Sequence, residues 1–386
     1  MHLINTSTYE MREFEGRDIP EYAILSHTWG EGEVTFTDYE SIDHARTRPA
    51  FHKIEHSCRL ATEYRLNWVW IDTCCIDKRS SAELSEAINS MFVWYRNSSV
   101  CFAYLSDVPA HVTAENDSDQ AFERSRWFTR GWTLQELLAP ENVVFYGNGW
   151  IEYGTRQQLK GRISAITNIN EVALEGRSNF KLYSVASRMS WAAQRQTNRV
   201  EDMAYCLLGI FEVHMPLLYG EGERAFIRLQ EEILRETDDQ SIFAWEREES
   251  GGSTFLSGLL AASPAYFTES KHFMRGWRVR NDIPPTVTSR GVRIKGPLVM
   301  HGKAVTGFSY LVLDCQDGRS TELNEEYMAI ELYNARPVPF HYRSQPWKLL
   351  RVTLTEEERV GLKEVYVQKT TDPNIDPFTL FFPEFP

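Results

Sequence analysis

The chain has 386 residues, of which 42% are hydrophobic and 13% aromatic, so it can form packed cores and is not a disordered protein. Its length predicts two or three domains. Its formal net charge of −13 argues against a nucleic-acid partner, because contacts with phosphates need concentrated lysine and arginine.

The chain shows no membrane or metal signature. Its N-terminus lacks a charged start followed by an apolar core, and no run of about 18 apolar residues occurs. Six cysteines are present, and the adjacent pair Cys74 and Cys75 lacks the spacing of a metal-binding Cys-x-x-Cys motif. We therefore expect a cytoplasmic protein with reduced thiols, no membrane span and no metal.

Strand and helix signals alternate along the first 150 residues. Apolar and β-branched runs predict strands at 22–26, 68–72, 100–105 and 143–146. Helical spacing predicts helices at 51–66, at 81–95, where Ser80 or Ser81 is the N-cap, and at a third segment that ends at Pro140. Such alternation predicts an α/β fold, with a parallel sheet that has helices on both faces.

The pattern changes beyond residue 155. Helical segments are predicted at 182–193, 199–211 and 223–236, and a charged and then glycine-rich stretch at 246–254 reads as a linker. Short strand-like runs separated by turn residues follow it. We predict an α/β core at 1–155, a helical part at 156–245, the linker at 246–254 and a small β-rich C-terminal domain at 255–386.

The helix before Pro140 carries the most suggestive carboxylate. Trp132 and Glu136 are four residues apart and are expected to share one face of this helix. A carboxylate beside an aromatic ring at a sheet edge is where glycosidic-bond chemistry could occur. The plainer interpretation is an amphipathic helix with one solvated glutamate.

Polar side chains follow two of the predicted strands. In a parallel α/β sheet, ligands bind at the carboxyl ends of the strands. The polar and aromatic candidates at these ends are Ser26, His27, Thr28, Trp29, Asp72, Cys75 and Asp77. His27 could instead be bonded to a loop carbonyl, and Asp72 could cap a turn. On residue types alone, Cys75 could be a nucleophile with His27 as its base.

Four segments carry a family resemblance. They are Tyr-Ala-Ile-Leu-Ser-His-Thr-Trp-Gly at 22–30, Trp-Ile-Asp-Thr-Cys-Cys-Ile-Asp-Lys at 70–78, Ser-Arg-Trp-Phe-Thr-Arg-Gly-Trp-Thr-Leu-Gln-Glu-Leu at 125–137 and Met-Pro-Leu-Leu-Tyr-Gly-Glu-Gly at 215–222. They closely resemble the fungal heterokaryon-incompatibility (HET) domain over roughly residues 1–245. The resemblance implies a filamentous-fungal allorecognition or innate-immunity protein whose activation leads to programmed cell death. It also implies NOD-like or other incompatibility proteins as partners, whereas self-association is implied by a second resemblance, to TIR-like enzymes, whose site is commonly completed by it.

A more distant resemblance concerns the TIR domain, whose sheet is flavodoxin-like. The order of strands and helices is similar, and Trp132-Thr-Leu-Gln-Glu136-Leu137 resembles the TIR tryptophan-to-glutamate motif. In NAD-cleaving TIR members this glutamate is catalytic, so the resemblance implies that Glu136 is catalytic and that NAD is the substrate. His27-Thr28-Trp29 departs from the usual aromatic or basic residues at the first strand end, and the insert at 109–121 is long.

Two functions from different classes follow from these resemblances. In the first, Glu136 stabilises the ribosyl cation as nicotinamide leaves, Trp132 or Trp29 stacks on a ring of the substrate, and Asp72 binds ribose. No cofactor is needed beyond NAD as substrate. In the second, the domain is a non-enzymatic adaptor that signals cell death by recruiting partners. A buried Glu136 paired with an arginine such as Arg130 would favour the adaptor, whereas a Glu136 that lines a pocket shared with residues 26–29 and Asp72 would favour the enzyme.

Overall fold

The computed structural model describes residues 1–117, 120–176, 180–248, 256–276, 283–299, 307–320, 326–334 and 341–370. The chain forms two compact units. Unit 1 comprises Met1–Asn179 and Arg195–Tyr219, and unit 2 comprises Phe180–Gln194 and Gly220–Pro386. Residues 249–254 of the predicted linker lie outside the described residues, and the domain boundaries inferred from the sequence stay a prediction.

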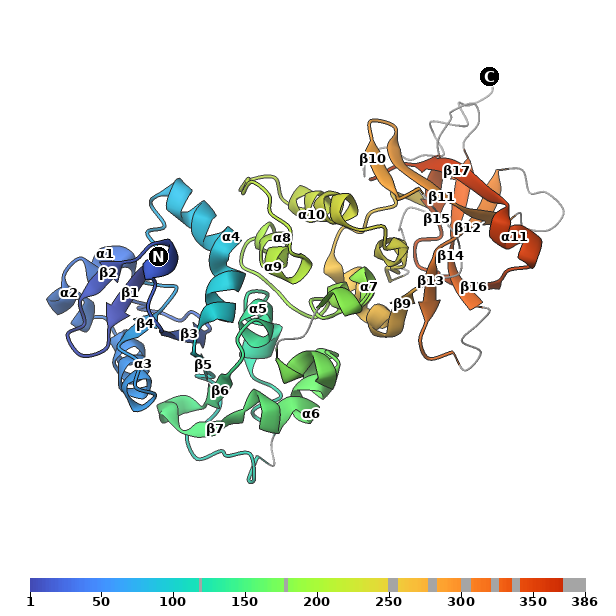
Figure 1. Ribbon diagram of the computed structural model, residues 1–386. Coiled ribbons are helices and arrows are strands. Elements are labelled where there is room, and N and C mark those ends of the chain that lie inside the picture. Colours follow the sequence, from blue (N-terminus) through green and yellow to red (C-terminus); the bar gives the residue numbers. More distant parts are fainter. Residues whose placement is uncertain are drawn as a thin grey trace, which may run out of the picture. The chain divides into compact units, whose positions relative to one another are not determined.

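A mixed sheet lies at the centre of unit 1, in the order β2-β1-β4-β3-β5-β6-β7 (Figure 1). Its strands are β1 (His2–Asn5), β2 (Met11–Glu13), β3 (Ala23–His27), β4 (Trp68–Trp70), β5 (Val100–Tyr104), β6 (Val143–Tyr146) and β7 (Glu152–Thr155). The pairs β3–β4, β3–β5 and β5–β6 are parallel, as the sequence predicts. The prediction of a parallel sheet is incomplete, because β1, β2 and β7 pair antiparallel at the two edges.

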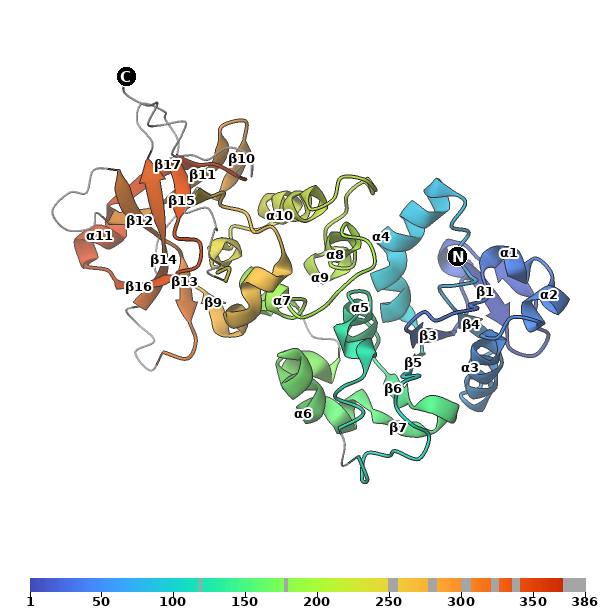
Figure 2. The same ribbon diagram turned by 180° about the vertical axis from the view of Figure 1, so that it is seen from behind.

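The four parallel strands are buried on both faces. Every residue of β3, β5 and β6 is buried, which explains their continuous apolar character. Across the sheet, the four parallel strands lie in the order β4-β3-β5-β6 (Figure 2). Numbered along the chain, this is the order 2-1-3-4 of flavodoxin-like sheets. The order reverses between β3 and β5. At such a switch point, ligands bind beyond the carboxyl ends of the strands.

Helices connect the parallel strands and cover both faces of the sheet. Those between the strands are α1 (Phe36–Tyr39), α2 (Ile42–Arg46), α3 (Phe51–Glu63), α4 (Ser81–Asn97), η2 (Arg126–Thr129) and α5 (Thr133–Leu138). The Ser80 side chain accepts a hydrogen bond from the Glu83 amide at 3.2 Å and caps α4, as predicted. The third predicted helix is shorter than expected, since only 133–138 is α-helical before Pro140.

Smaller helices complete unit 1. They are η1 (Gly16–Asp18), η3 (Asn148–Trp150), η4 (Glu171–Glu175), α6 (Arg156–Thr167), α8 (Asp202–Tyr205) and α9 (Leu208–Phe211). A glycine is required where α9 meets α4, because a Cβ at Gly209 would lie 2.1 Å from the Cβ of Phe92. The predicted helix at 199–211 is two short helices, α8 and α9, of which α9 packs against α4.

Unit 2 contains helices and a β-rich part, and the β-rich character of the C-terminal region is as predicted. Its helices are η5 (Phe180–Leu182), α7 (Val185–Ser190), α10 (Arg224–Glu236), η6 (Gln240–Phe243), η7 (Pro264–His272) and α11 (Glu356–Val360). Its strands are β8 (Leu256–Ser257), β9 (Phe273–Arg275), β10 (Thr286–Thr288), β11 (Gly291–Val299), β12 (Phe308–Val312), β13 (Cys315–Asp317), β14 (Glu326–Asn334), β15 (His341–Ser344), β16 (Leu350–Thr353) and β17 (Leu362–Val367).

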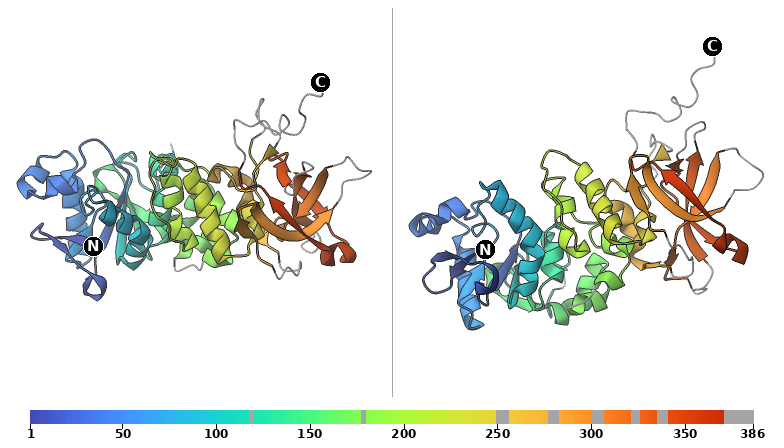
Figure 3. Two further views of the ribbon diagram at one scale, coloured as in Figure 1. Left: turned by 90° about the horizontal axis from the view of Figure 1, so that it is seen from above. Right: turned by 45° about the horizontal axis from the view of Figure 1, so that its top comes forward.

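Most strands of unit 2 form one twisted sheet, drawn in orange and red in Figure 3. Its order is β16-β14-β12-β11-β17-β15-β8, and β10 pairs with β11. Val312, Tyr327, Ala329 and Leu354 form a buried apolar cluster on it. None of the helices described in either unit is long and apolar enough to cross a membrane.

Candidate functional site

Glu136 lies at the switch point of the unit 1 sheet. It is on α5 and is only 5% exposed. The Ser26 hydroxyl, near the carboxyl end of β3, donates a hydrogen bond to Glu136 Oε2 and accepts one from Trp127 Nε1 at 2.9 Å. Arg130 donates to Asn198 Oδ1 at 2.7 Å. The ion pair between Glu136 and Arg130 that would favour an adaptor is therefore not formed.

The surroundings of Glu136 favour its protonated form. Burial raises its pKa to about 8, and the nearby negative charge of Asp72 acts in the same direction. The hydrogen bond from Ser26, the contact with the Tyr95 hydroxyl and the positive charge of Arg195 lower this pKa, but by less. Burial therefore favours the protonated carboxyl group at neutral pH.

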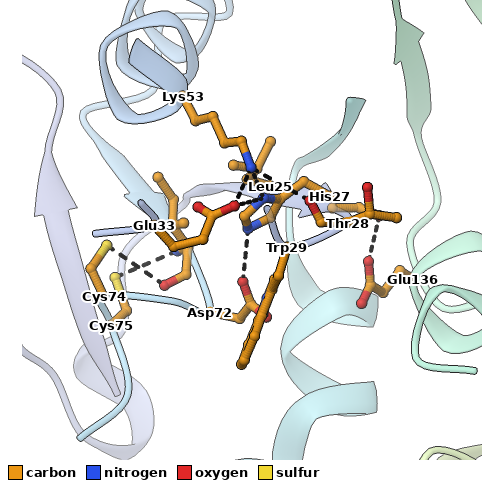
Figure 4. A network of polar contacts seen from close by, with 12 residues as sticks. Leu25, His27, Thr28, Trp29, Glu33, Lys53, Asp72, Cys74, Cys75 and Glu136 are labelled. Atoms are coloured by element: carbon orange, nitrogen blue, oxygen red, sulfur yellow. Dashed lines mark hydrogen bonds and ion pairs between the residues drawn. The ribbon is translucent and has the colours of Figure 1, made fainter. Parts of the chain in front are cut away.

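A second polar cluster surrounds His27, the last residue of β3 (Figure 4). Successive side chains of a strand point to opposite faces, so His27 faces α3 whereas Ser26 faces α5. Its Nε2 is 3.0 Å from Asp72 Oδ1, and its Nδ1 is 3.0 Å from Lys53 Nζ. Lys53 is buried and forms an ion pair with Glu33.

Asp72 connects this cluster to the exposed part of the site. Its Oδ2 accepts a hydrogen bond from Trp29 Nε1 at 2.8 Å. Burial alone would raise the pKa of Asp72, but the hydrogen bond with His27, together with Lys78 and Trp29, holds it below its usual value. Trp29 is 47% exposed, and Lys78 Nζ lies 3.6 Å from the centre of its ring. An ionised carboxylate and an accessible aromatic ring are therefore available to a ligand.

Of the predicted site residues, Ser26 and Glu136 thus lie in one cluster, and His27, Trp29 and Asp72 in the other. Three other candidates contribute no side chain to either cluster. The indole of Trp132, which precedes α5, hydrogen-bonds Asp202. Asp77 accepts two hydrogen bonds from the Arg79 guanidinium, each of 2.9 Å. The main-chain carbonyl of Thr28 accepts a hydrogen bond from Lys53 at 3.5 Å, so Thr28 contributes through its backbone.

The thiols do not form a reactive or metal-binding centre. All six cysteines are free and buried. Cys75 Sγ accepts from the Ile71 amide at 3.5 Å, and burial raises the pKa of Cys74 well above its usual value. Both ring nitrogens of His27 have protein partners, so His27 is not placed as the base of Cys75. Across the described residues, no group of three or more His, Cys, Asp or Glu side chains could hold a metal.

Four residues of the two clusters were not among the predicted site residues: Glu33, Lys53, Tyr95 and Trp127. The sequence could have indicated Lys53, because Lys53, Ser57 and Leu60 have helical spacing and lie along one buried stripe of α3. A lysine in such a stripe is unusual unless it is paired. Glu33 lies in a loop and carries no sequence signal of its own.

Comparisons with known proteins agree with part of this picture. Residues 22–113 match the model of the family "Heterokaryon incompatibility protein (HET)", and residues 224–274 match a domain of unknown function, DUF8212. The first range includes His27, Lys53 and Asp72 but not Glu136. No solved structure matches the chain.

One characterised relative supports the same relationship. The vegetative incompatibility protein HET-E-1 of Podospora anserina is 48% identical over 224 residues, which is 56% of this chain. The chain spans only 16% of the length of that relative. Residues 22–113 in unit 1 thus match the HET family model, and the chain is similar to a fungal vegetative incompatibility protein.

Proposed function

We propose that the chain acts in fungal heterokaryon incompatibility, as an allorecognition or innate-immunity protein that triggers cell death. The HET match at 22–113 and the 48% identity to HET-E-1 support this role. NOD-like or other incompatibility proteins are the partners that we propose for it, and the cytoplasm is its proposed location.

The proposed activity of unit 1 is hydrolysis of the nicotinamide–ribose bond of NAD, in a TIR-like site with Glu136 as the catalytic residue. The observation that carries it is the hydrogen bond from Ser26 to Glu136 at the switch point between β3 and β5. The flavodoxin-like order of the parallel strands is compatible with a TIR-like fold. Asp72 and Trp29, at the same sheet edge, are the proposed contacts for ribose and for a substrate ring.

The proposed reaction requires little beyond one carboxylate. The bond between ribose C1′ and the nicotinamide nitrogen breaks, and its electron pair neutralises the positively charged ring, which leaves as neutral nicotinamide. The ribosyl centre becomes cationic and is stabilised by ionised Glu136. Water then adds to C1′ and releases a proton, giving ADP-ribose. The positive charge of bound NAD favours the ionised form of a carboxyl group whose pKa is about 8.

The test is nicotinamide release from NAD by the purified chain over a range of protein concentrations, because self-association is proposed to complete the site. Glu136→Gln is expected to reduce release by about 100-fold or more. The matched control is Glu63→Gln, which changes an exposed glutamate of α3. Equal release by Glu136→Gln and the unchanged protein would contradict the catalytic role.

The alternative proposal is a non-enzymatic adaptor, and the burial of Glu136 favours it. At 5% exposure, and with Ser26 and Tyr95 as partners, this carboxyl group could be a structural element of the sheet. An adaptor predicts that folded Glu136→Gln still triggers cell death on expression in a filamentous fungus. Loss of cell death together with loss of nicotinamide release would favour the enzyme.

A further inference from the structure

The buried ion pair between Lys53 and Glu33 is not explained by catalysis at Glu136. Lys53 is 7% exposed and lies on the sheet-facing side of α3. A buried charge is unfavourable unless it is paired and hydrogen-bonded, and an apolar residue would fill this position at less cost. The partners of Lys53 should therefore indicate what the charge does.

The Lys53 ammonium group has three acceptors for its three protons. They are Glu33 Oε1, His27 Nδ1 at 3.0 Å and the Thr28 carbonyl at 3.5 Å. Glu33 is fixed in turn, because its Oε1 also accepts from the Gly30 amide at 2.8 Å. The ammonium group is thus held against one ring nitrogen of His27 (Figure 4).

This contact defines the tautomer of His27. An ammonium group can only donate, so Nδ1 must be the unprotonated nitrogen. The ring proton is then on Nε2, which donates it to Asp72 Oδ1 at 3.0 Å. With Nδ1 protonated instead, two donors would face each other and Asp72 would lose its hydrogen bond from the ring.

We propose that Lys53, supported by Glu33, is a positioning residue that fixes the Nε2-protonated tautomer of His27 and thereby the orientation of the Asp72 carboxylate. The role of Asp72 as a ribose contact rests on the proposed function. The tautomer rests on geometry alone. Trp29 holds the other oxygen of Asp72, so His27 and Trp29 together leave this carboxylate one orientation.

The direct test is NMR of the full chain labelled with 15N-histidine. Two-bond proton–nitrogen spectra distinguish the two tautomers, and the signal of His27, one of 10 histidines, is assigned by its loss in His27→Gln. In the unchanged protein the signal should show protonated Nε2 and bare Nδ1. In Lys53→Met it should show a mixture of ring forms, because no donor faces Nδ1. Lys53→Arg, which keeps a cationic donor, should restore the single form.

Two further variants separate this effect from loss of folding. Lys160→Met breaks a more exposed ion pair of unit 1, with Glu175 at 2.6 Å, and should leave the His27 signal unchanged. If Lys53→Met does not fold, Lys53→Met combined with Glu33→Gln removes the unpaired carboxylate and should still show mixed ring forms. A single Nε2-protonated form in folded Lys53→Met or in the double variant would overturn the proposal, as would protonated Nδ1 in the unchanged protein.

Activity provides a second measurement. Nicotinamide release by Lys53→Met is expected to fall about tenfold, mainly in kcat, because Asp72 is no longer oriented. Lys53→Arg should recover most of it. If the unchanged protein released no nicotinamide, the proposed function would fail, while the NMR result would still decide the role of Lys53. If Lys53→Met changed the tautomer of His27 without changing nicotinamide release, Asp72 would have no part in the reaction.

Discussion

Buried polar side chains are used differently in the two units. In unit 1 they bond to one another at the carboxyl ends of parallel strands, as Ser26 does to Glu136 and His27 does to Asp72. In unit 2 two fully buried side chains, Arg343 and Gln230, bond to the main chain, whereas Ser344 donates to the Glu331 carboxylate. The guanidinium of Arg343, which is fully buried, donates to the carbonyls of Phe243, at 3.1 Å, and Trp245.

A second pair of contacts in unit 2 shows the same use. Gln230 on α10 donates to the Ala261 carbonyl at 2.8 Å and accepts from the Ala261 amide at 2.9 Å. Satisfying main-chain groups stabilises a fold and leaves the side chain no freedom to act. The comparison therefore assigns structural support to these contacts of unit 2, and the proposed chemistry concerns the clusters of unit 1.

The largest expected effect concerns unit 1 and is the pH dependence of stability caused by buried Glu136. Its pKa in the folded protein is about 8, above the 4.5 of an exposed glutamate. The neutral carboxyl group of Glu136 therefore fits the folded protein better than the charged one. The free energy of unfolding is highest below about pH 4.5 in this respect, and it falls as the pH rises towards 8. From pH 5 to 8, Glu136→Gln should gain stability relative to the unchanged protein, by about 1.4 kcal/mol per pH unit at most. Urea unfolding at several pH values measures this, and a pH-independent difference would contradict the raised pKa.

Arg343→Met tests the other side of the comparison. It leaves the carbonyls of Phe243 and Trp245 without their buried donor and removes a cation 3.8 Å from the centre of the Trp245 ring. We expect a loss of about 3 kcal/mol in the free energy of unfolding of unit 2. Urea unfolding followed by tryptophan fluorescence checks it, with exposed Arg290→Met as control. Unchanged stability would mean that Arg343 is not a structural support.

Ser26→Ala is expected to have a smaller effect on stability and a distinct effect on activity. It removes the hydrogen bond to Glu136 and leaves the Trp127 indole without its acceptor, which should cost about 1–2 kcal/mol. Because the Ser26 hydrogen bond lowers the pKa of Glu136, the rise of nicotinamide release with pH should move to higher pH. Release measured from pH 6 to 9 tests this, and Ser7→Ala, at an exposed serine, is the control.

The smallest effect is expected at the exposed edge of the site. Lys78→Met removes the ammonium group above the Trp29 ring, a contact worth about 0.5–1 kcal/mol at an exposed position. Thermal unfolding should change little. If Trp29 binds a substrate ring, removing its lysine cover should alter KM for NAD more than kcat. A large loss of stability would instead assign Trp29 and Lys78 to structural support.

The sequence was informative where local pattern decides structure. The four parallel strands lie where their apolar runs predict them, and α4 begins after Ser80 as its capping pattern predicts. The short edge strands β1, β2 and β7 were missed. They have three or four residues each and no continuous apolar run, so only pairing with a neighbour defines them.

The candidate site was predictable in its position but not in its contacts. The polar residues after two strands do lie at one edge of the sheet, because parallel strands end together. Trp132 was assigned by spacing to the same helix face as Glu136, but α5 begins only at Thr133 and the indole is bonded to Asp202. The partner of the indole is 70 residues away along the chain, so the spacing within the helix could not indicate it.

The sequence by itself determined the strands, the capped helix and a polar sheet edge, since these depend on periodicity and on neighbours a few residues away. Only the tertiary structure decided which groups meet there. Ser26 and Glu136 are 110 residues apart, and His27 and Asp72 are 45 apart. The pKa of Glu136 and the tautomer of His27 depend on burial and on such distant partners, because electrostatic interactions act through space and not along the chain.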